Sequence, residues 1–157
     1  MIRIAKALPS DLETVLKMRY ETMRNVCGFS EDFEFTEEFY IESERYFQKG
    51  DHMTVLAWDG ETAVGCASIC YISVMPTFSH PGGKRAHLMN VYVRSSHRRH
   101  GIARNMLEHL IADAHKRNTT QITLDATDDG RVLYESLGFK ASGECMVKNL
   151  REDPKKY

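Results

Sequence analysis

The sequence predicts an α/β fold in which a mixed, mostly antiparallel central sheet is flanked by helices. Stretches with the two-residue hydrophobic period of strands alternate with stretches of helical period along the 157 residues. A turn signal, Asp59-Gly60, joins two of the strand-like stretches, which indicates a hairpin and antiparallel pairing. Two later strand-like stretches are separated by a long helical one, so the connection between them must cross over the sheet.

The N-terminal part is predicted to form one strand and two helices. Residues 2–5 alternate apolar and polar side chains, as a short strand does. The pair Ser10-Asp11 is placed to cap a first helix, which Gly28 ends. Thr36 is placed to cap a second helix, which ends at Gly50.

The middle of the chain predicts three strands and one loop. The hairpin turn joins strands at 53–58 and 63–74, and a further strand is expected at 86–93. The stretch 76–83 holds two prolines and two glycines, so we expect it to be a loop.

The C-terminal part predicts a helix at 102–117, a strand at 121–126, a short helix at 130–137 and a last strand at 139–147. Gly138 should stop the short helix, and Gly143 interrupts the last strand. The long helix is indicated by an apolar stripe at helical spacing, formed by Ile102, Met106, Leu107, Leu110, Ile111 and Ala114.

Composition sets limits on organisation and location. The length suits a single domain over 1–150, followed by a polar tail at 151–157. A net charge of −1 gives no overall attraction to nucleic acid, so no nucleic-acid partner is expected. No apolar run approaches the ~20 residues that span a bilayer. The N-terminus lacks the features of a secretory signal, so we expect a cytoplasmic protein without membrane contact. The four cysteines form no Cys-x-x-Cys pair, so no metal site is expected.

Basic side chains nevertheless gather in one part of the chain. No Asp or Glu occurs between Glu61 and Glu108, and the densest basic stretch, 94–104, falls where a predicted strand turns into a helix. The unpaired N–H groups of a first helical turn favour an anion, and Gly101 lets the backbone approach it closely. The sequence therefore predicts a diphosphate-binding loop at 98–103, with a solvated basic helix start as the alternative. The glycine spacings of a P-loop and of a dinucleotide fingerprint are both absent.

Two motifs resemble those of one enzyme family. The stretch Arg-Arg-His-Gly-Ile-Ala at 98–103 is similar to the Arg/Gln-x-x-Gly-x-Gly/Ala loop of the GCN5-related N-acetyltransferases (GNAT). The stretch 133–139 matches the Leu-Tyr-x-x-x-Gly-Phe signature of that family, in the right order and separation. The resemblance extends over nearly the whole element order, and it implies the GNAT (acyl-CoA N-acyltransferase) fold.

The resemblance implies acetyl-CoA as co-substrate and assigns residues to it. Backbone N–H groups of the loop would bind the diphosphate, and the strand before the loop would pair with pantetheine as an added strand does. A backbone N–H at Val91 would donate to the thioester carbonyl. The implied CoA-binding residues are Val91, Tyr92, Val93, Arg98, Arg99, His100, Gly101, Ile102, Ala103 and Arg104.

The implied reaction is direct attack of an amine on the thioester in a ternary complex. Tyr134 falls at the position of a family tyrosine that protonates the departing thiolate, although a tyrosine packed under the cofactor is the alternative. Many members carry Asn where this chain has Asp128, which still suits a helix cap but puts a direct contact with CoA in doubt.

The general base and the acceptor stay open. Asp125, His87 and Glu21 are candidate bases, and a water relay without a single base is an equal alternative. Asn90 cannot accept a proton but can orient an amine or water, and Asn90 and Glu21 are candidate contacts to the acceptor. The acceptor, a small-molecule or peptide amine, is expected between the first two helices and the 74–85 loop. An acidic lip there would attract a cation, although a solvated helix face explains the same residues: Glu31, Asp32, Glu34, Glu37 and Glu38.

Competing functions follow from the same residues. A non-catalytic CoA-binding regulatory module on the same fold is the main alternative. A nucleic-acid binder is disfavoured, because no aromatic residues are interleaved with the basic ones. The resemblance also makes a homodimer an expected assembly.

Overall fold

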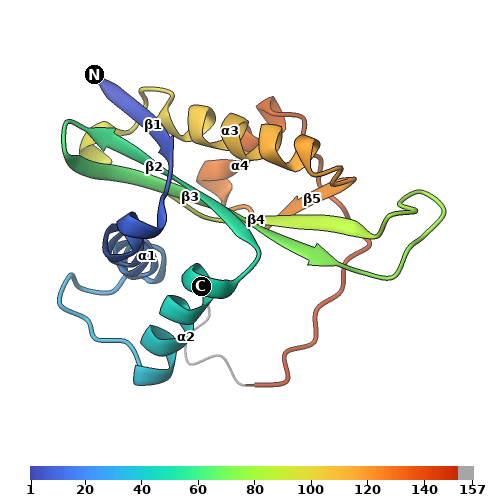
Figure 1. Cartoon of the computed structure of the whole chain (residues 1–157), viewed down its shortest axis with the longest axis horizontal. Helices are drawn as coiled ribbons and strands as arrows, with labels where there is room; N and C mark the ends of the chain where they lie inside the picture. Colours follow the sequence, from blue (N-terminus) through green and yellow to red (C-terminus); the bar gives the residue numbers. More distant parts are fainter. Residues whose placement is uncertain (152–157) are drawn as a thin grey trace.

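The computed structural model describes residues 1–151 and contains a five-stranded sheet in the order β1-β2-β3-β4-β5 (Figure 1). The strands are β1 Ile2–Lys6, β2 His52–Asp59, β3 Thr62–Ser73, β4 Lys84–Val93 and β5 Gln121–Leu124. The helices are α1 Leu12–Cys27, α2 Glu37–Lys49, α3 Ile102–Lys116 and α4 Asp128–Ser136, with short 3₁₀ turns at Pro9–Asp11 and Ser95–His97.

The sheet is mixed, as the sequence predicts. Strands β1 to β4 pair antiparallel with their neighbours, whereas β4 and β5 run parallel because α3 crosses over between them. The predicted hairpin between β2 and β3 and the loop before β4 are both present.

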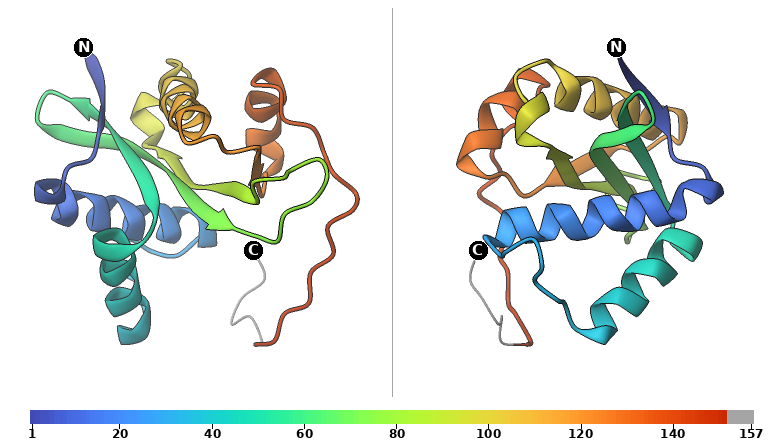
Figure 2. Two further views of the ribbon diagram at one scale, coloured as in Figure 1. Left: turned by 45° about the vertical axis from the view of Figure 1, so that its right-hand side comes forward. Right: turned by 90° about the vertical axis from the view of Figure 1, so that its left-hand side faces the viewer.

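Helices cover both faces of the sheet (Figure 2), with α3 and α4 on one face and α1 and α2 on the other. The larger core lies under α3, where Met106, Leu107 and Leu110 are fully buried. The predicted apolar stripe of this helix is thus confirmed, except that Ile111 is only half-buried. A smaller core joins α1 to β2 and β3 through Val15, Met18 and three neighbours.

The predicted helix ends at Gly28, Thr36 and Gly50 are confirmed, but the predicted side-chain cap of α1 is not formed. The Thr36 hydroxyl accepts a hydrogen bond from the Phe39 N–H at 3.3 Å, and Gly28 ends α1 with a φ of 66°. Asp11 stands at the start of α1 but accepts a hydrogen bond from the Leu8 N–H at 2.8 Å instead of capping the helix.

Two predictions about the C-terminal part are wrong. Residues 139–147 form no strand: Phe139 still packs against the core, and the chain then runs away from the sheet (Figure 1) with residues 140–150 exposed. The alternation of apolar and polar side chains in this stretch is short and is broken by Gly143, so it provides no continuous apolar face to pack on the core. The local pattern alone therefore does not make a strand there. The cap of α4 is Thr127, whose hydroxyl accepts from the Gly130 N–H at 3.3 Å, and Asp128 is the first helical residue.

The end of the chain lies mostly beyond the described residues. Of the predicted tail 151–157 only Arg151 is described, and its guanidinium lies 3.5 Å from the Glu38 carboxylate on α2. Within residues 1–151, no helix is both long and apolar enough to span a membrane.

Candidate active site

Strand β4 continues past the end of β5, and the opening left beside β4 is called the fork below. The pairing of these two strands runs from Arg85 opposite Gln121 to Leu88 opposite Leu124, where β5 ends. Strand β4 continues to Val93, and its other edge stays paired with β3. Beyond Leu88, the β5-side edge of β4 therefore has no partner strand in the described part of the chain.

A bulge lies on β4 just inside this fork. Ser68 of β3 pairs with Met89 and Cys66 pairs with Tyr92, so β4 has one residue more than β3 between these pairs. Asn90 takes up the extra residue with a φ of 60°, a left-handed conformation that Asn adopts more readily than most residues.

The hydrogen-bonding groups past the bulge point into the fork. The Arg94 N–H donates to the Val64 carbonyl of β3 at 2.9 Å. Because successive N–H groups of a strand point to opposite sides, the N–H groups of Val91 and Val93 face away from β3. This open edge can bind an extended amide chain such as pantetheine, as a further strand would bind.

The predicted diphosphate loop lies between β4 and α3. Arg99 and Gly101 have φ values of 67° and 74°, so the backbone turns sharply before α3 begins. Among residues 1–151, no backbone carbonyl accepts from the N–H groups of Arg99 to Arg104. The first N–H of α3 with such an acceptor is that of Asn105, which donates to the Gly101 carbonyl at 3.0 Å. These six N–H groups and the helix dipole suit a diphosphate.

The basic side chains of the loop differ in their availability. Arg98 donates from Nε to the Val93 carbonyl at 2.9 Å, so it ties the loop to the end of β4. Arg104 donates to the Ser136 hydroxyl at 2.5 Å, which ties the start of α3 to α4. Arg99 is exposed and forms no ion pair with the described residues, so its guanidinium is available to an anion.

Tyr134 lies on α4, half-buried against the larger core. Its ring packs edge-on against Phe139 at a centroid distance of 6.0 Å. A Cβ on Gly130 would lie 3.0 Å from the Tyr134 ring, so the ring packs tightly over the start of the helix. Burial raises the pKa of the phenol, and its hydroxyl has no hydrogen-bond partner in the described structure. A protonated donor is therefore available here.

His87 and Asp125 meet across β4 and β5, just before the fork opens. The His87 Nδ1 lies 2.8 Å from the Thr123 hydroxyl, and its Nε2 lies 3.6 Å from the Asp125 carboxylate. Thr123 donates its own proton to the Ala86 carbonyl at 3.4 Å, so its oxygen accepts from His87 Nδ1–H. The neutral imidazole then carries its lone pair on Nε2, beside Asp125.

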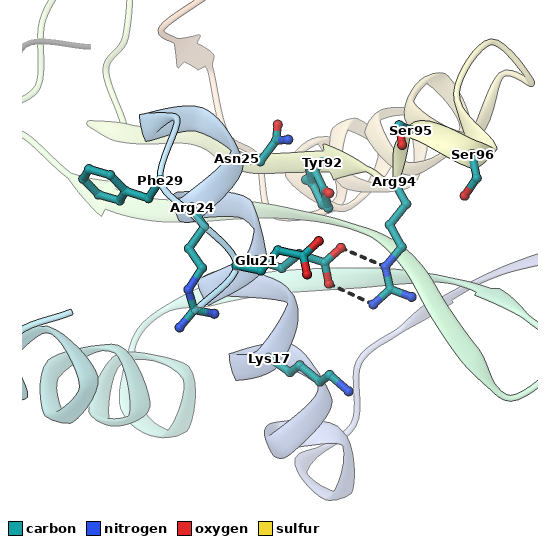
Figure 3. Close-up of a pocket in the computed structure, with 10 residues that line it drawn as sticks. Lys17, Glu21, Arg24, Asn25, Phe29, Tyr92, Arg94, Ser95 and Ser96 are labelled. Atoms are coloured by element: carbon teal, nitrogen blue, oxygen red, sulfur yellow. Dashed lines mark hydrogen bonds and ion pairs between the residues drawn. The ribbon is translucent and has the colours of Figure 1, made fainter. Parts of the chain in front are cut away.

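Glu21 is not grouped with these residues. It lines a pocket of about 580 Å³ between α1 and the end of β4 (Figure 3), where Arg94 donates to both carboxylate oxygens at 2.8 Å. The hydrogen bond from Arg94 lowers the Glu21 pKa, which makes this carboxylate a poor base. The pocket is lined by Lys17, Glu21, Arg24, Asn25, Phe29, Glu31, Tyr92, Arg94, Ser95 and Ser96.

The connection between α1 and α2 holds an aromatic cluster. Phe29 stacks on Phe33 with centroids 3.9 Å apart, and Tyr20 meets the edge of Tyr40 at 4.8 Å. These side chains mainly pack on one another; Phe29 also lines the pocket. The predicted acidic lip is exposed beside the cluster.

Several residues around the site were not predicted. Arg94, which pairs with Glu21, and Arg19, which contacts Asn90, act through tertiary contacts that no spacing in the sequence indicates. The bulge did have a signal, because an Asn inside the apolar stretch 88–93 breaks the alternation at a residue that tolerates a positive φ. No group of three metal-ligating side chains occurs within residues 1–151, and a metal-free site stays a prediction.

Known proteins resemble this chain in sequence and in fold. The model of the Acetyltransferase (GNAT) family matches residues 16–139. The uncharacterized N-acetyltransferase YsnE of Bacillus subtilis (strain 168) is 27% identical over 89 residues, which are 54% of this chain and 53% of that protein. The chain thus spans about half the length of this curated relative.

Solved structures match almost the whole chain. A predicted acetyltransferase from Clostridium acetobutylicum, solved with acetyl-CoA, is 27% identical with a TM-score of 0.84, covering 96% of this chain and 97% of that one. A GCN5-related N-acetyltransferase from Ralstonia eutropha JMP134 shares the fold at 23% identity and a TM-score of 0.79, covering 96% and 99%. The family model takes in both the predicted diphosphate loop and Tyr134, and the chain belongs to the GNAT acetyltransferase family.

Proposed function

We propose that the chain is an acetyl-CoA-dependent N-acetyltransferase that acetylates a small-molecule or peptide amine by direct attack in a ternary complex. The observation that carries the proposal is the open edge of β4, which leads to six unpaired N–H groups at the start of α3. The similarity to a structure that was solved with acetyl-CoA supports the same co-substrate.

Each part of the site has a role in holding acetyl-CoA. The N–H groups of Arg99 to Arg104 bind the diphosphate, with added charge from Arg99. The backbone of Val91 to Val93 pairs with the pantetheine amides. The Val91 N–H donates to the thioester carbonyl and stabilises the negative charge that its oxygen gains during attack.

His87 and Asp125 act together as the base. His87 lies four residues before Val91, roughly 13 Å along an extended strand, so it takes the proton of the amine through water. The imidazolium formed at Nε2 is stabilised by the Asp125 carboxylate 3.6 Å away. Asn90 and Glu21 take no proton in this scheme.

Tyr134 completes the transfer. The amine nitrogen forms a bond to the carbonyl carbon, and the carbon–sulfur bond breaks. The sulfur leaves as thiolate and receives the phenolic proton of Tyr134. Burial keeps this phenol protonated at neutral pH, as its raised pKa requires.

An acetylation screen over amine classes, measured as CoA release, tests the function. We expect release with at least one class, and we expect His87→Gln to lower the rate with that class, because the variant has no base at this position to take the proton of the amine. Binding of acetyl-CoA without release by any amine class would instead favour the non-catalytic module. Absence of acetyl-CoA binding would exclude both.

A further inference from the structure

The peptide that carries the Val91 N–H is fixed from the side of β3. The Cys66 thiol donates to the Asn90 carbonyl, with 3.3 Å between sulfur and oxygen. Burial raises the Cys66 pKa to about 11, so the thiol keeps the proton that this hydrogen bond needs. Because a trans peptide is planar, the Val91 N–H points opposite to the Asn90 carbonyl and thus into the fork.

The Asn90 side chain is fixed on both of its amide atoms. Arg19 of α1 donates from Nη1 to the Asn90 Oδ1 at 3.3 Å, and the Asn90 Nδ2 donates to the Ser68 hydroxyl at 3.3 Å. Asn90 is 8% exposed and Ser68 is 2% exposed, so the bond between them is buried, whereas the bond from Arg19 is partly buried. Removing either partner leaves a buried polar atom without its hydrogen bond, which is costly.

A series of hydrogen bonds leads from Ser68 to the Phe47 carbonyl at the end of α2. The Ser68 hydroxyl lies 2.8 Å from that of Thr54, which lies 3.2 Å from His52 Nδ1, and His52 Nε2 lies 3.0 Å from the Phe47 carbonyl. A carbonyl only accepts, so His52 donates from Nε2, and a neutral imidazole then accepts at Nδ1. Thr54 then donates to His52, and Ser68 donates to Thr54. Ser68 is left with only its acceptor position for the Asn90 amide.

Both ends of this series set the orientation of Asn90. Arg19 can only donate, so the Asn90 oxygen must face it, and the nitrogen must face Ser68. Arg19 also lies over the Phe39 ring of α2, at 5.8 Å from its centroid. A left-handed Asn inside a strand persists only when its surroundings fix it, and Arg19 supplies one of these contacts.

We propose that Arg19 is a positioning residue for acetyl transfer: through the Asn90 amide it maintains the β4 bulge and so aims the Val91 N–H at the thioester carbonyl. This inference rests on the proposed function, in which that N–H polarises the thioester. Arg19 acts through Asn90 and is assigned no contact with the reacting atoms.

Infrared spectroscopy of bound acetyl-CoA, labelled with ¹³C at the acetyl carbonyl, tests the inference without a known acceptor. In the wild-type protein, the carbonyl stretch should move to lower frequency on binding. Arg19→Leu should lose most of this shift, and Arg19→Lys, which keeps a donor, should restore it. Acetyl-CoA affinity by calorimetry should hardly change, because the loop provides most of the contacts. Once an acceptor is identified, the kcat of Arg19→Leu should be roughly 100-fold lower than that of the wild type, which is the loss expected when the Val91 N–H is displaced by about 1 Å from the thioester carbonyl.

Arg3→Leu is the matched control, because Arg3 lies over the Trp58 ring at 5.6 Å on the far edge of the sheet. It removes a guanidinium from an aromatic face and should leave the shift unchanged. If Arg19→Leu does not fold, Ser68→Ala tests the opposite side of the same amide, with the same loss expected. A folded Arg19→Leu or Ser68→Ala protein with the wild-type shift would overturn the inference while leaving the proposed function intact. A wild-type protein that binds acetyl-CoA without any shift would also overturn it, and one that binds no acetyl-CoA would overturn the proposed function itself.

Discussion

Replacement of Gly101 by Ala should weaken CoA binding while leaving the fold intact. Gly101 stands at the start of α3 with a φ of 74°, in the left-handed region. A Cβ added there would meet no atom within 4 Å, so the free protein has room for it. The cost is conformational, because an L-residue in this region is disfavoured by about 1–2 kcal/mol.

That cost should appear in the affinity. The free loop of Gly101→Ala can relax toward a negative φ, whereas binding of the diphosphate requires the N–H groups to converge again. Binding must then supply the 1–2 kcal/mol, which corresponds to a roughly 5- to 30-fold increase in Kd for CoA. Pantetheine lacks the diphosphate and contacts β4, so its Kd should not change.

Calorimetric titration with CoA and with pantetheine measures both effects. Gly28→Ala is the matched control, since Gly28 has a φ of 66° and equally open surroundings but ends α1. It should lower the free energy of unfolding by a similar amount and leave the Kd for CoA unchanged. Equal CoA affinity in Gly101→Ala and wild type would refute the assignment of the diphosphate to this loop, as would an equal loss for pantetheine.

Further predictions concern the two sides of the fork. Tyr134→Phe keeps the ring packing and removes the proton donor, so kcat should fall about 100-fold with CoA affinity unchanged; an unchanged kcat would reduce Tyr134 to a packing role. Glu21→Gln should lower the free energy of unfolding at neutral pH by about 1–2 kcal/mol, because Arg94 loses a bidentate partner. The Glu21 pKa is lowered in the folded protein, so the pair stabilises above the ordinary Glu pKa of 4.5 and is lost as pH falls through the folded value. The difference between Glu21→Gln and wild type in denaturant unfolding should therefore shrink as pH falls below 4.5, and a difference independent of pH would contradict this.

Local sequence was enough to predict the elements whose apolar pattern or turn residues match the contacts that they make in the fold. Helix α3 was predictable because its apolar stripe and its burial coincide, and the β2–β3 hairpin because its turn residues demand it. The strand at 139–147 was wrong since strand formation depends on a neighbour to pair with, which a local pattern does not report. The cap of α4 was misplaced by one residue between Thr127 and Asp128, two side chains that both suit a cap.

The backbone of the proposed site follows from local sequence more directly than its side-chain contacts do. Glycine and charge predict an anion-binding loop at 98–103, and the structure places N–H groups without backbone acceptors there, while the binding itself stays a prediction. The pairing of Glu21 with Arg94 joins residues far apart in the chain, so the sequence offered Glu21 as a candidate base or acceptor contact and gave no sign of the ion pair that lowers its pKa. The contact of Arg19 with Asn90 depends on the approach of α1 to a bulge, which is a tertiary event.

Amide hydrogen exchange measured residue by residue by NMR, with and without acetyl-CoA, tests most directly whether acetyl-CoA binds along β4 and the start of α3. Acetyl-CoA should slow exchange at Val91 and Val93 and across 99–104, where the N–H groups lack backbone acceptors in the free protein. Amides of β1 and β2, which are paired already, should be unaffected. Protection confined to other parts of the chain, or none at saturating acetyl-CoA, would contradict the assignment of this site.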